Sequence, residues 1–470
     1  MYRKPKIGFV TISDNREKAH TELLPVNIEF ENYVIGKIRE HDDFELVTSD
    51  VIVHTAREAV EAAHKLNAAG IDGLIMNFTI WVYPNLAVIL ARNIDKPILM
   101  LSNLHPERAG LVGMMASAGS LDQMGRQNYR VWGDIARPEV YEKVVSFARA
   151  SAVVNGLKGS VYGMFGGRSM GMYTGVAEQS VWMKKFGIDC EHIDEMEILR
   201  NADLVDKDRI ERAFEWLTEN IGEIKYNGTG LTPEKLHFQI ACYLATKDMI
   251  KERELDFIGI KCQPEMGNHF VTQCLTQAFS NDFYDMEGDK DITVCACEND
   301  MDGGLTMQML HLLTGLPTLF FDFRHYDMEN DVFVFSNCGS QSTYYAARSR
   351  NCQENLCKVK CFAQTPEFYP AGGATVRYMA APGQLTCARL TRKDGKYRMV
   401  IFPAQVETFP EEKMLETSNE WPQAFVRINV TPEQLINIYG SNHAHAVEGY
   451  HVKELVKICE MLDIESIVLE

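Results

Sequence analysis

Two acidic residues in this sequence each end a stretch that is typical of a β-strand. Glu298 follows the apolar residues 292–297, Asp322 follows the apolar residues 317–321, and a helix-like segment over residues 305–314 separates them. In a right-handed strand–helix–strand crossover the two strands are parallel, so side chains at their carboxyl ends emerge at one edge of the sheet. We therefore expect Glu298 and Asp322 to be neighbours.

Two neighbouring carboxylates and a nearby imidazole form a donor set for Mn²⁺ or a similar divalent cation. The candidates for the imidazole are His443 and His445, which stand close to the C-terminus. Taken alone, an acidic residue at a strand end is more often a helix cap or a turn residue than a metal ligand. The combination of the three side chains, rather than either acid, predicts a metal site.

Two further motifs carry less chemical information. The cysteines 352, 357 and 361 lack the Cys-x2-Cys spacing of a structural zinc site. The glycine-rich segment 166–172 follows a strand-like stretch and precedes a helix-like one, but it matches neither the dinucleotide-binding fingerprint nor the Walker loop. It indicates only that the backbone approaches another group closely there.

The elements that must position these residues follow an alternating pattern. Strand-like and helix-like stretches alternate from residue 6 onward, and the nearly continuous apolar runs 73–77 and 98–101 are typical of a parallel sheet covered by helices on both faces. The alternation restarts after a glycine-containing linker over residues 155–159. Beyond Asp322, short strand-like stretches follow at residues 332–335, 374–380, 384–391 and 397–402, and a helix over 451–462 precedes a last strand over 467–469.

We therefore predict an α/β protein in which two doubly wound parallel-sheet domains are followed by a β-rich C-terminal domain. The first N-terminal, Rossmann-like domain covers residues 1–155, the second α/β domain covers 156–318, and the β-rich domain covers 319–470. In this division the second domain carries Glu298, and the third carries Asp322 and His443.

Composition excludes several classes of function. The chain has 470 residues and a formal net charge of −18, which opposes binding to nucleic acid or to an anionic membrane surface. No run of about 18 apolar residues occurs, so we expect no membrane span. Neither an export signal nor a targeting segment is apparent, and the 12 cysteines are interpreted as reduced thiols. We expect a cytoplasmic protein.

Taken together, several segments resemble the L-fucose isomerase family. They are Gly167-Arg-Ser-Met-Gly-Met172, Phe257-Ile-Gly-Ile-Lys-Cys262, the two stretches that end at Glu298 and Asp322, and Asn442-His443. The resemblance implies two α/β domains and a β-rich C-terminal domain, and an enzyme that interconverts aldoses and ketoses with Mn²⁺. It also implies that Glu298, Asp322 and His443 bind the metal and that the two acids are the catalytic acid/base pair.

The same resemblance implies further roles. Arg16 and Trp81 match positions that reach into the active site of a neighbouring subunit, so the relatives' hexamers imply a homo-oligomer with active sites at subunit interfaces. Gln263 stands roughly where the family has a substrate-binding glutamine, although the residues around it, Cys262 and Pro264, depart from the family pattern. We expect Asn442 to orient its neighbours beside the substrate, and His445 is the alternative metal ligand.

The expected reaction is an aldose–ketose isomerisation of a monosaccharide such as L-fucose or D-arabinose through a cis-enediol. An alternative keeps the reaction but changes the substrate to the sulfonated sugar sulfoquinovose, because the wider family includes such isomerases. Its anion would need cationic donors, for which the candidates are Arg16, Lys261, His269 and Arg324. A sugar-binding protein and a metal-dependent hydrolase or aldolase are less favoured.

Overall fold

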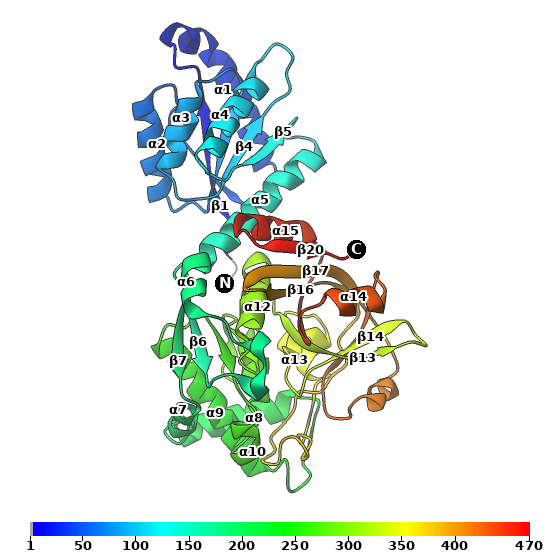
Figure 1. Cartoon of the computed structure of the whole chain (residues 1–470). Coiled ribbons are helices and arrows are strands. Elements are labelled where there is room, and N and C mark those ends of the chain that lie inside the picture. Colours follow the sequence, from blue (N-terminus) through cyan, green and yellow to red (C-terminus); the bar gives the residue numbers. More distant parts are fainter. Residues whose placement is uncertain (1–2) are drawn as a thin grey trace. The chain divides into compact units, whose positions relative to one another are not determined.

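The computed structural model describes residues 3–470, and its internal contacts divide the chain into two units (Figure 1). The N-terminal unit consists of residues 3–156 together with Lys453–Asp463 from the end of the chain. The C-terminal unit consists of Leu157–Val452 and Ile464–Glu470. Within residues 3–470, no helix combines the length and the apolar character needed to cross a bilayer.

The N-terminal unit is built on a parallel sheet with the strand order β2-β1-β3-β4-β5. Its elements are β1 (Lys6–Ile12), α1 (Glu17–Arg39), β2 (Glu45–Thr48), α2 (Ala56–Ala68), β3 (Gly73–Phe78), α3 (Pro84–Arg92), β4 (Ile98–Ser102), α4 (Gly110–Gln123), β5 (Tyr129–Trp132), α5 (Pro138–Leu157) and α15 (Val452–Met461). Every residue of β3 and β4 is buried. One apolar cluster joins the sheet to α2, α3 and α4, and another joins it to α1 and α5, so helices cover both faces.

The last helix of the chain, α15, belongs to this N-terminal unit. Its side chains Leu455 and Ile458 are fully buried. Ser146 on α5 donates a hydrogen bond to Glu454 at 3.2 Å, and the side chain of Gln127 donates to the carbonyl oxygen of Glu460 at 2.7 Å. The end of the chain therefore completes the core of the unit in which the chain begins.

The C-terminal unit begins with a second parallel sheet, which has the strand order β12-β9-β6-β7. Its strands are β6 (Val161–Phe165), β7 (Asp189–Ile193), β9 (Phe257–Ile260) and β12 (Val294–Cys297). The helices of this region are η1 (Ser169–Gly171), η2 (Tyr173–Gly175), α6 (Gln179–Phe186), α7 (Glu195–Ala202), α8 (Lys207–Asn220), α9 (Pro233–Glu252), α10 (Glu265–His269), α11 (Cys274–Ser280) and α12 (Met301–Thr314). The buried, β-branched and aromatic residues of β6 and β9 make it an interior sheet.

The same unit contains a second sheet that closes into a barrel. Its strands follow the order β16-β19-β13-β14-β18-β17-β20, and the pairing of β16 with β17 closes the ring. They are β13 (Leu319–Asp327), β14 (Val332–Ser336), β16 (Gly383–Lys393), β17 (Lys396–Glu407), β18 (Gln423–Ile428), β19 (His443–Glu448) and β20 (Glu465–Val468). Closure leaves few unpaired strand edges.

Smaller elements connect these sheets. They are β8 (Glu223–Lys225), β10 (Tyr284–Asp285), β11 (Gly288–Asp289), η3 (Thr343–Ala346), α13 (Cys352–Leu356), β15 (Lys360–Phe362), η4 (Glu411–Glu416) and α14 (Pro432–Ile438). Strand β15 pairs in parallel with β8, and β10 pairs with β11 as a short hairpin.

The predicted fold class is confirmed, because two parallel α/β sheets precede a β-rich C-terminal sheet. The division into three domains stays a prediction.

Two local expectations from the sequence are wrong. Strand β13 does not lie parallel to β12 in one sheet, since it joins the barrel and pairs antiparallel with β14 and β19. Residues 374–380 form only single bridges, at Ala374, Arg377 and Met379, because their pairing partners change along the segment.

The packing of α15 generates a prediction about stability. Leu455→Ala should lower the free energy of unfolding by about 2–5 kcal/mol, because it removes a fully buried side chain and leaves a cavity. Urea unfolding followed by fluorescence measures the change. The control is Lys453→Ala in the same helix, whose partner is the exposed Glu142 and whose loss should cost less than about 1 kcal/mol. Equal effects of the two substitutions would contradict the role of α15 in the core.

Candidate functional site

Three of the residues that the sequence predicts to act together meet in the C-terminal unit. His443 on β19 lies directly across from Asp322 on β13 in the antiparallel register. Its Nε2 atom is 3.6 Å from Oδ1 of Asp322 and 3.1 Å from Oε2 of Glu298. The imidazole is fully buried, whereas the side chain of Asp322 is 31% exposed. The group is therefore closed behind the histidine and open beside Asp322.

Glu298 reaches this position because the backbone turns sharply where β12 ends. Both Glu298 and Asn299 adopt left-handed backbone angles, with φ values of 57° and 49°. Such angles are unfavourable for residues with a side chain and often occur at functional sites. The turn is held by a hydrogen bond from the Asn299 amide to the carbonyl oxygen of Ile260 at 3.0 Å, and by one from the Tyr162 hydroxyl to Oδ1 of Asn299 at 2.8 Å.

Behind the histidine lies a buried ion pair between Asp300 and Arg389, both of which are fully buried. His443 Nδ1 and Arg389 Nη1 both donate to Oδ2 of Asp300, at 2.7 and 2.5 Å. The other oxygen, Oδ1, accepts from Arg389 Nη2 at 3.1 Å and from the Gly303 amide at 2.9 Å, which caps α12. Asp300 thus fixes the orientation of the imidazole and directs Nε2 towards Glu298 and Asp322.

The charges around the group perturb its titration. Burial lowers the pKa of His443, but its hydrogen bond to Asp300 and the nearby carboxylate of Glu298 outweigh this effect and raise the pKa to about 10. Burial also raises the pKa of Asp322 to about 6, although the His443 charge opposes the shift. The pKa of Asp300 is held far below its usual range, because the Arg389 charge and the His443 hydrogen bond overcome the opposing effect of burial.

The donor set fits a divalent cation. Oε2 of Glu298 and Nε2 of His443 are buried 3.1 Å apart, and within residues 3–470 neither makes a well-oriented hydrogen bond, which is uncommon for polar atoms inside a protein. Two carboxylates and one imidazole suit cations such as Mn²⁺. The carboxylate of Asp300 behind the imidazole matches the usual support of a metal-binding histidine. Glu298, Asp322 and His443 are the residues that would hold the ion.

Two other predicted residues lie at or near this group. Asn442 donates from Nδ2 to Oδ1 of Asp322 at 3.0 Å. Gln263 follows β9, the strand beside β12, so it stands at the same edge of the parallel sheet as Glu298, and its side chain donates to the carbonyl oxygen of Phe368 at 3.2 Å. His445 is instead engaged behind the site, where its Nε2 accepts from Arg389 at 2.9 Å.

Arg16 and Trp81 lie in the N-terminal unit. They follow the adjacent strands β1 and β3, at the carboxyl edge where the strand order reverses and where ligands commonly bind. The guanidinium of Arg16 is 62% exposed and pairs with the buried carboxylate of Asp14, with Nε 3.0 Å from Oδ1. Trp81 is half-buried. The structure does not bring these two residues together with Glu298, Asp322 and His443 within one unit.

The sequence analysis did not single out Asp300 or Arg389. Asp300 precedes a helix with Gly303 three positions later, which is the pattern of an ordinary helix cap. Arg389 stands between the apolar residues Ala388 and Leu390 in the middle of a strand-like stretch, and a charged residue in such a place is a sign of a buried ion pair. That sign points to Arg389 but does not identify its partner.

Comparison with known proteins places the chain in one family. Residues 4–159 match the family model of the first N-terminal domain of L-fucose isomerase, and residues 335–470 match that of its C-terminal domain. Asn442 and His443 lie inside the second match, and Glu298 and Asp322 lie between the two. The chain belongs to the L-fucose isomerase-like family.

Curated relatives align over nearly the whole isomerase. An L-fucose isomerase of Streptococcus pneumoniae (strain P1031) is 26% identical over 99% of this chain and 93% of its own length. An L-fucose isomerase of Vibrio vulnificus is 24% identical over 96% and 90%, and one of Haemophilus influenzae (strain KW20 / Rd) is 22% identical over 96% and 89%. Membership makes this protein an aldose–ketose sugar isomerase, which is an intramolecular oxidoreductase.

The buried ion pair of the isomerase generates a second prediction. Asp300→Asn should lower the free energy of unfolding by about 3–5 kcal/mol, because it leaves the charge of Arg389 buried without a partner. The change is measured by urea unfolding at neutral pH. Asp302→Asn is the matched control: Asp302 lies on the same turn, but its partner Arg392 is 25% exposed and can be solvated.

The effect of the control substitution Asp302→Asn on the free energy of unfolding should itself depend on pH. Burial raises the pKa of Asp302 from 3.8 to about 6, against the lowering effect of Arg392, so the native state binds more protons than the unfolded state between these values. The Asp302 contribution to stability is therefore lost as the pH rises from about 4 to about 6. Across that range, the Asp302→Asn variant should gain stability relative to the unmodified protein. An opposite trend, or a smaller cost for Asp300→Asn than for Asp302→Asn, would contradict this account of the network.

Proposed function

We propose that this protein is a metal-dependent isomerase that interconverts a monosaccharide aldose and its ketose through a cis-enediol, with Mn²⁺ as the metal. The observation that supports the proposal best is the convergence of Glu298, Asp322 and His443, in which carboxylate oxygens of the two acids lie 3.1 and 3.6 Å from His443 Nε2. A bound divalent cation would polarise the sugar carbonyl and acidify the adjacent C–H group.

The proton transfer is the task of the two carboxylates. In the proposed mechanism one of Glu298 and Asp322 removes the proton from the carbon next to the carbonyl, and a proton returns to the neighbouring carbon. A base works best when its pKa is near the working pH, and the pKa of Asp322, which burial raises to about 6, is closer to neutrality than that of an ordinary aspartate. Asn442 holds Oδ1 of Asp322 in place.

The proposed substrate is a neutral sugar similar to L-fucose or D-arabinose, and the curated relatives are named L-fucose isomerases. Sulfoquinovose is the second candidate, because Arg324 lies near enough to Asp322 for its charge to lower the pKa of that carboxyl group, and a sulfonate needs such a cation. Lys261, another candidate donor, is already paired with Glu265 at 2.7 Å.

A panel of sugars tests the proposal. The purified protein is incubated with Mn²⁺ in D₂O with L-fucose, D-arabinose, L-rhamnose and sulfoquinovose, and nuclear magnetic resonance detects new ketose signals or deuterium at C2. We expect one sugar to be isomerised and a chelator to stop the reaction. Glu298→Gln should lower kcat by about 10²–10⁴-fold, because it removes both a base and a metal ligand.

The control for this test is Glu265→Gln, which changes an exposed carboxylate near the same sheet edge and should leave the sugar specificity and the metal requirement as they are. Binding of a sugar without any exchange or conversion would favour a sugar-binding protein. A change in the mass of the product would favour a hydrolase or an aldolase. Turnover that survives removal of all divalent cations would overturn the proposed mechanism.

We also propose that the protein is a homo-oligomer, a hexamer by its resemblance to the family, in which Arg16 and Trp81 of one subunit line the site of another. Two features support this proposal. Arg16 is exposed yet held rigidly by the buried Asp14, and it stands at the ligand-binding edge of a doubly wound sheet. Such a side chain suits contact with a sugar hydroxyl group more than a role in folding.

Subunit mixing tests whether the site is shared. Arg16→Ala and Glu298→Gln subunits should each have little activity, and mixed oligomers should recover a part of it, because some sites then combine an intact Arg16 with an intact Glu298. Native mass spectrometry verifies that the oligomers are mixed. No recovery in verified mixed oligomers would contradict a site built from two subunits.

A further inference from the structure

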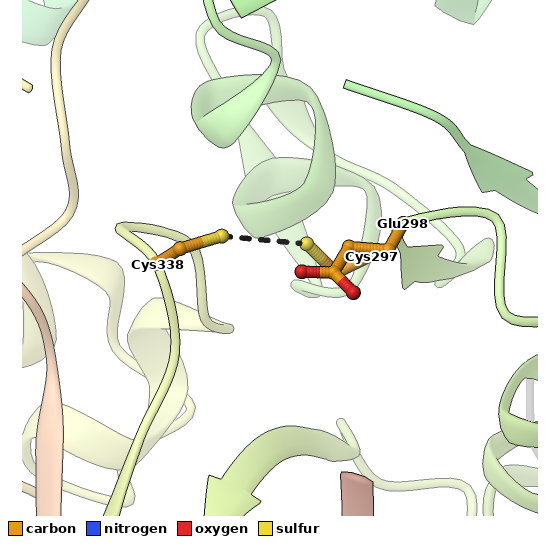
Figure 2. Close-up of side chains that lie close together, drawn as sticks. All are labelled: Cys297, Glu298 and Cys338. Atoms are coloured by element: carbon orange, nitrogen blue, oxygen red, sulfur yellow. Dashed lines mark hydrogen bonds between the residues drawn. The ribbon is translucent and has the colours of Figure 1, made fainter. Parts of the chain in front are cut away.

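A second group of potential metal ligands shares Glu298 with the candidate site and adds two thiols that the proposed reaction does not use. Donor atoms of Cys297, Glu298 and Cys338 all lie within 4.8 Å of one another. Figure 2 shows the two thiols pointing towards each other, with the carboxylate of Glu298 beside Cys297. Cys297 is buried, whereas Cys338 is half-buried, so the group is closed on one side and reachable on the other.

The separation of the two sulfur atoms matches a metal site better than a disulfide. Their distance is 3.9 Å. Two thiolates bound to one tetrahedral zinc at about 2.3 Å are about 3.8 Å apart. A disulfide would need the sulfur atoms at about 2.05 Å. The thiols are therefore in hydrogen-bond contact at a spacing that two ligands of one ion also take, and they would have to move much closer to form a disulfide.

The backbone on both sides holds this arrangement in place. Cys297 is the last residue of β12, and the left-handed turn at Glu298 lets two consecutive side chains face the same region. Cys338 lies in the tight loop between β14 and η3, where Gly339 has a φ of 112°. Its carbonyl oxygen accepts hydrogen bonds from the side chains of Gln364 and Cys274. The loop therefore presents the Cys338 thiol at a fixed position.

Glu298 brings a buried carboxylate to this group. Its side chain is 10% exposed, and within residues 3–470 the ion-pair partner of its Oε2 is Nε2 of His443, at 3.1 Å. A buried carboxylate is costly unless cations or hydrogen-bond donors satisfy it. The thiols add soft donors, which favour zinc-group cations over Mn²⁺.

We propose that Cys297, Cys338 and Glu298 form a second metal site, which binds a thiophilic divalent cation of the zinc group and competes with the proposed catalytic metal for Glu298. Metal binding at this second site does not require that the protein isomerises a sugar. The competition rests on the proposed function, because it requires that Glu298 also serves the catalytic cation. Such coupling is reciprocal, so each cation would weaken the binding of the other.

Cadmium is the probe for the binding step. The full-length protein, reduced and freed of metal, is titrated with Cd²⁺ alone, and the ultraviolet charge-transfer absorption of the thiolate–cadmium bond is recorded. We expect this absorption to saturate with one equivalent. Cys297→Ser and Cys338→Ser should each abolish it and weaken Cd²⁺ binding at least about 100-fold. Circular dichroism confirms that the variants are folded.

The matched control is Cys357→Ser, which removes an exposed thiol outside the group. It should keep both the absorption and the affinity. Three outcomes would each overturn the proposed site: loss of the absorption in Cys357→Ser, its persistence in either Cys297→Ser or Cys338→Ser, and its absence from the unmodified protein.

A second arm tests the competition for Glu298. With the Mn²⁺-loaded protein and a sugar that it isomerises, Cd²⁺ should inhibit the reaction, and Cys338→Ser should require at least about tenfold more Cd²⁺ for the same fractional inhibition. Binding without inhibition would overturn the sharing of Glu298. If no sugar is isomerised, the proposed function fails while the absorption titration still decides whether the site exists.

Discussion

The buried ion pair between Arg389 and Asp300 is the interaction on which the site depends. Arg389 comes from the barrel, whereas Asp300 lies at the junction between the parallel sheet and α12, so the pair joins the two sheets of the C-terminal unit. A buried ion pair stabilises a fold little after desolvation, and its retention points to a positioning role. Here the same carboxylate also caps α12 and accepts a hydrogen bond from Nδ1 of His443. One side chain thus fixes a helix, a strand and an imidazole together.

This arrangement explains why a strained backbone is tolerated at Glu298 and Asn299. A left-handed residue with a side chain costs about 1–3 kcal/mol and persists only where its surroundings determine it. The surroundings here are the Tyr162 hydroxyl on one side and the cap of α12 on the other. The strained turn places the carboxylate of Glu298, at the edge of the parallel sheet, next to His443 of the barrel. Precise positioning of a reacting group requires such a well-determined backbone.

The sequence reveals the local elements better than it reveals their partners. The buried runs of β3 and β4, the alternation of the parallel sheets and the amphipathic α15 are visible because each depends on neighbouring residues. The segment from β12 to β13 has the local pattern of a crossover, yet β13 joins the barrel because its partner β19 lies more than 100 residues further on. Glu298 and Asp322 are close together, as the sequence predicts, but not because their strands are parallel neighbours in one sheet. Asp300 escaped notice because a helix cap and a histidine-orienting carboxylate look the same in a sequence.

The electrostatics of the site favour a positive charge at one point. Glu298 and Asp322 repel each other, and this repulsion helps burial to raise the pKa of Asp322 to about 6. In the protein alone the opposing charge comes from His443, whose pKa rises to about 10 because Asp300 and Glu298 overcome its burial. A divalent cation at this point would satisfy the same carboxylates and would require a neutral imidazole as its ligand, so cation binding and proton loss would be coupled. Glu298 lies between these hard donors and the two thiols, and one carboxylate could not fully satisfy a cation on each side. With both proposed sites present, the choice of metal would therefore depend on Glu298, the residue that the strained backbone places there.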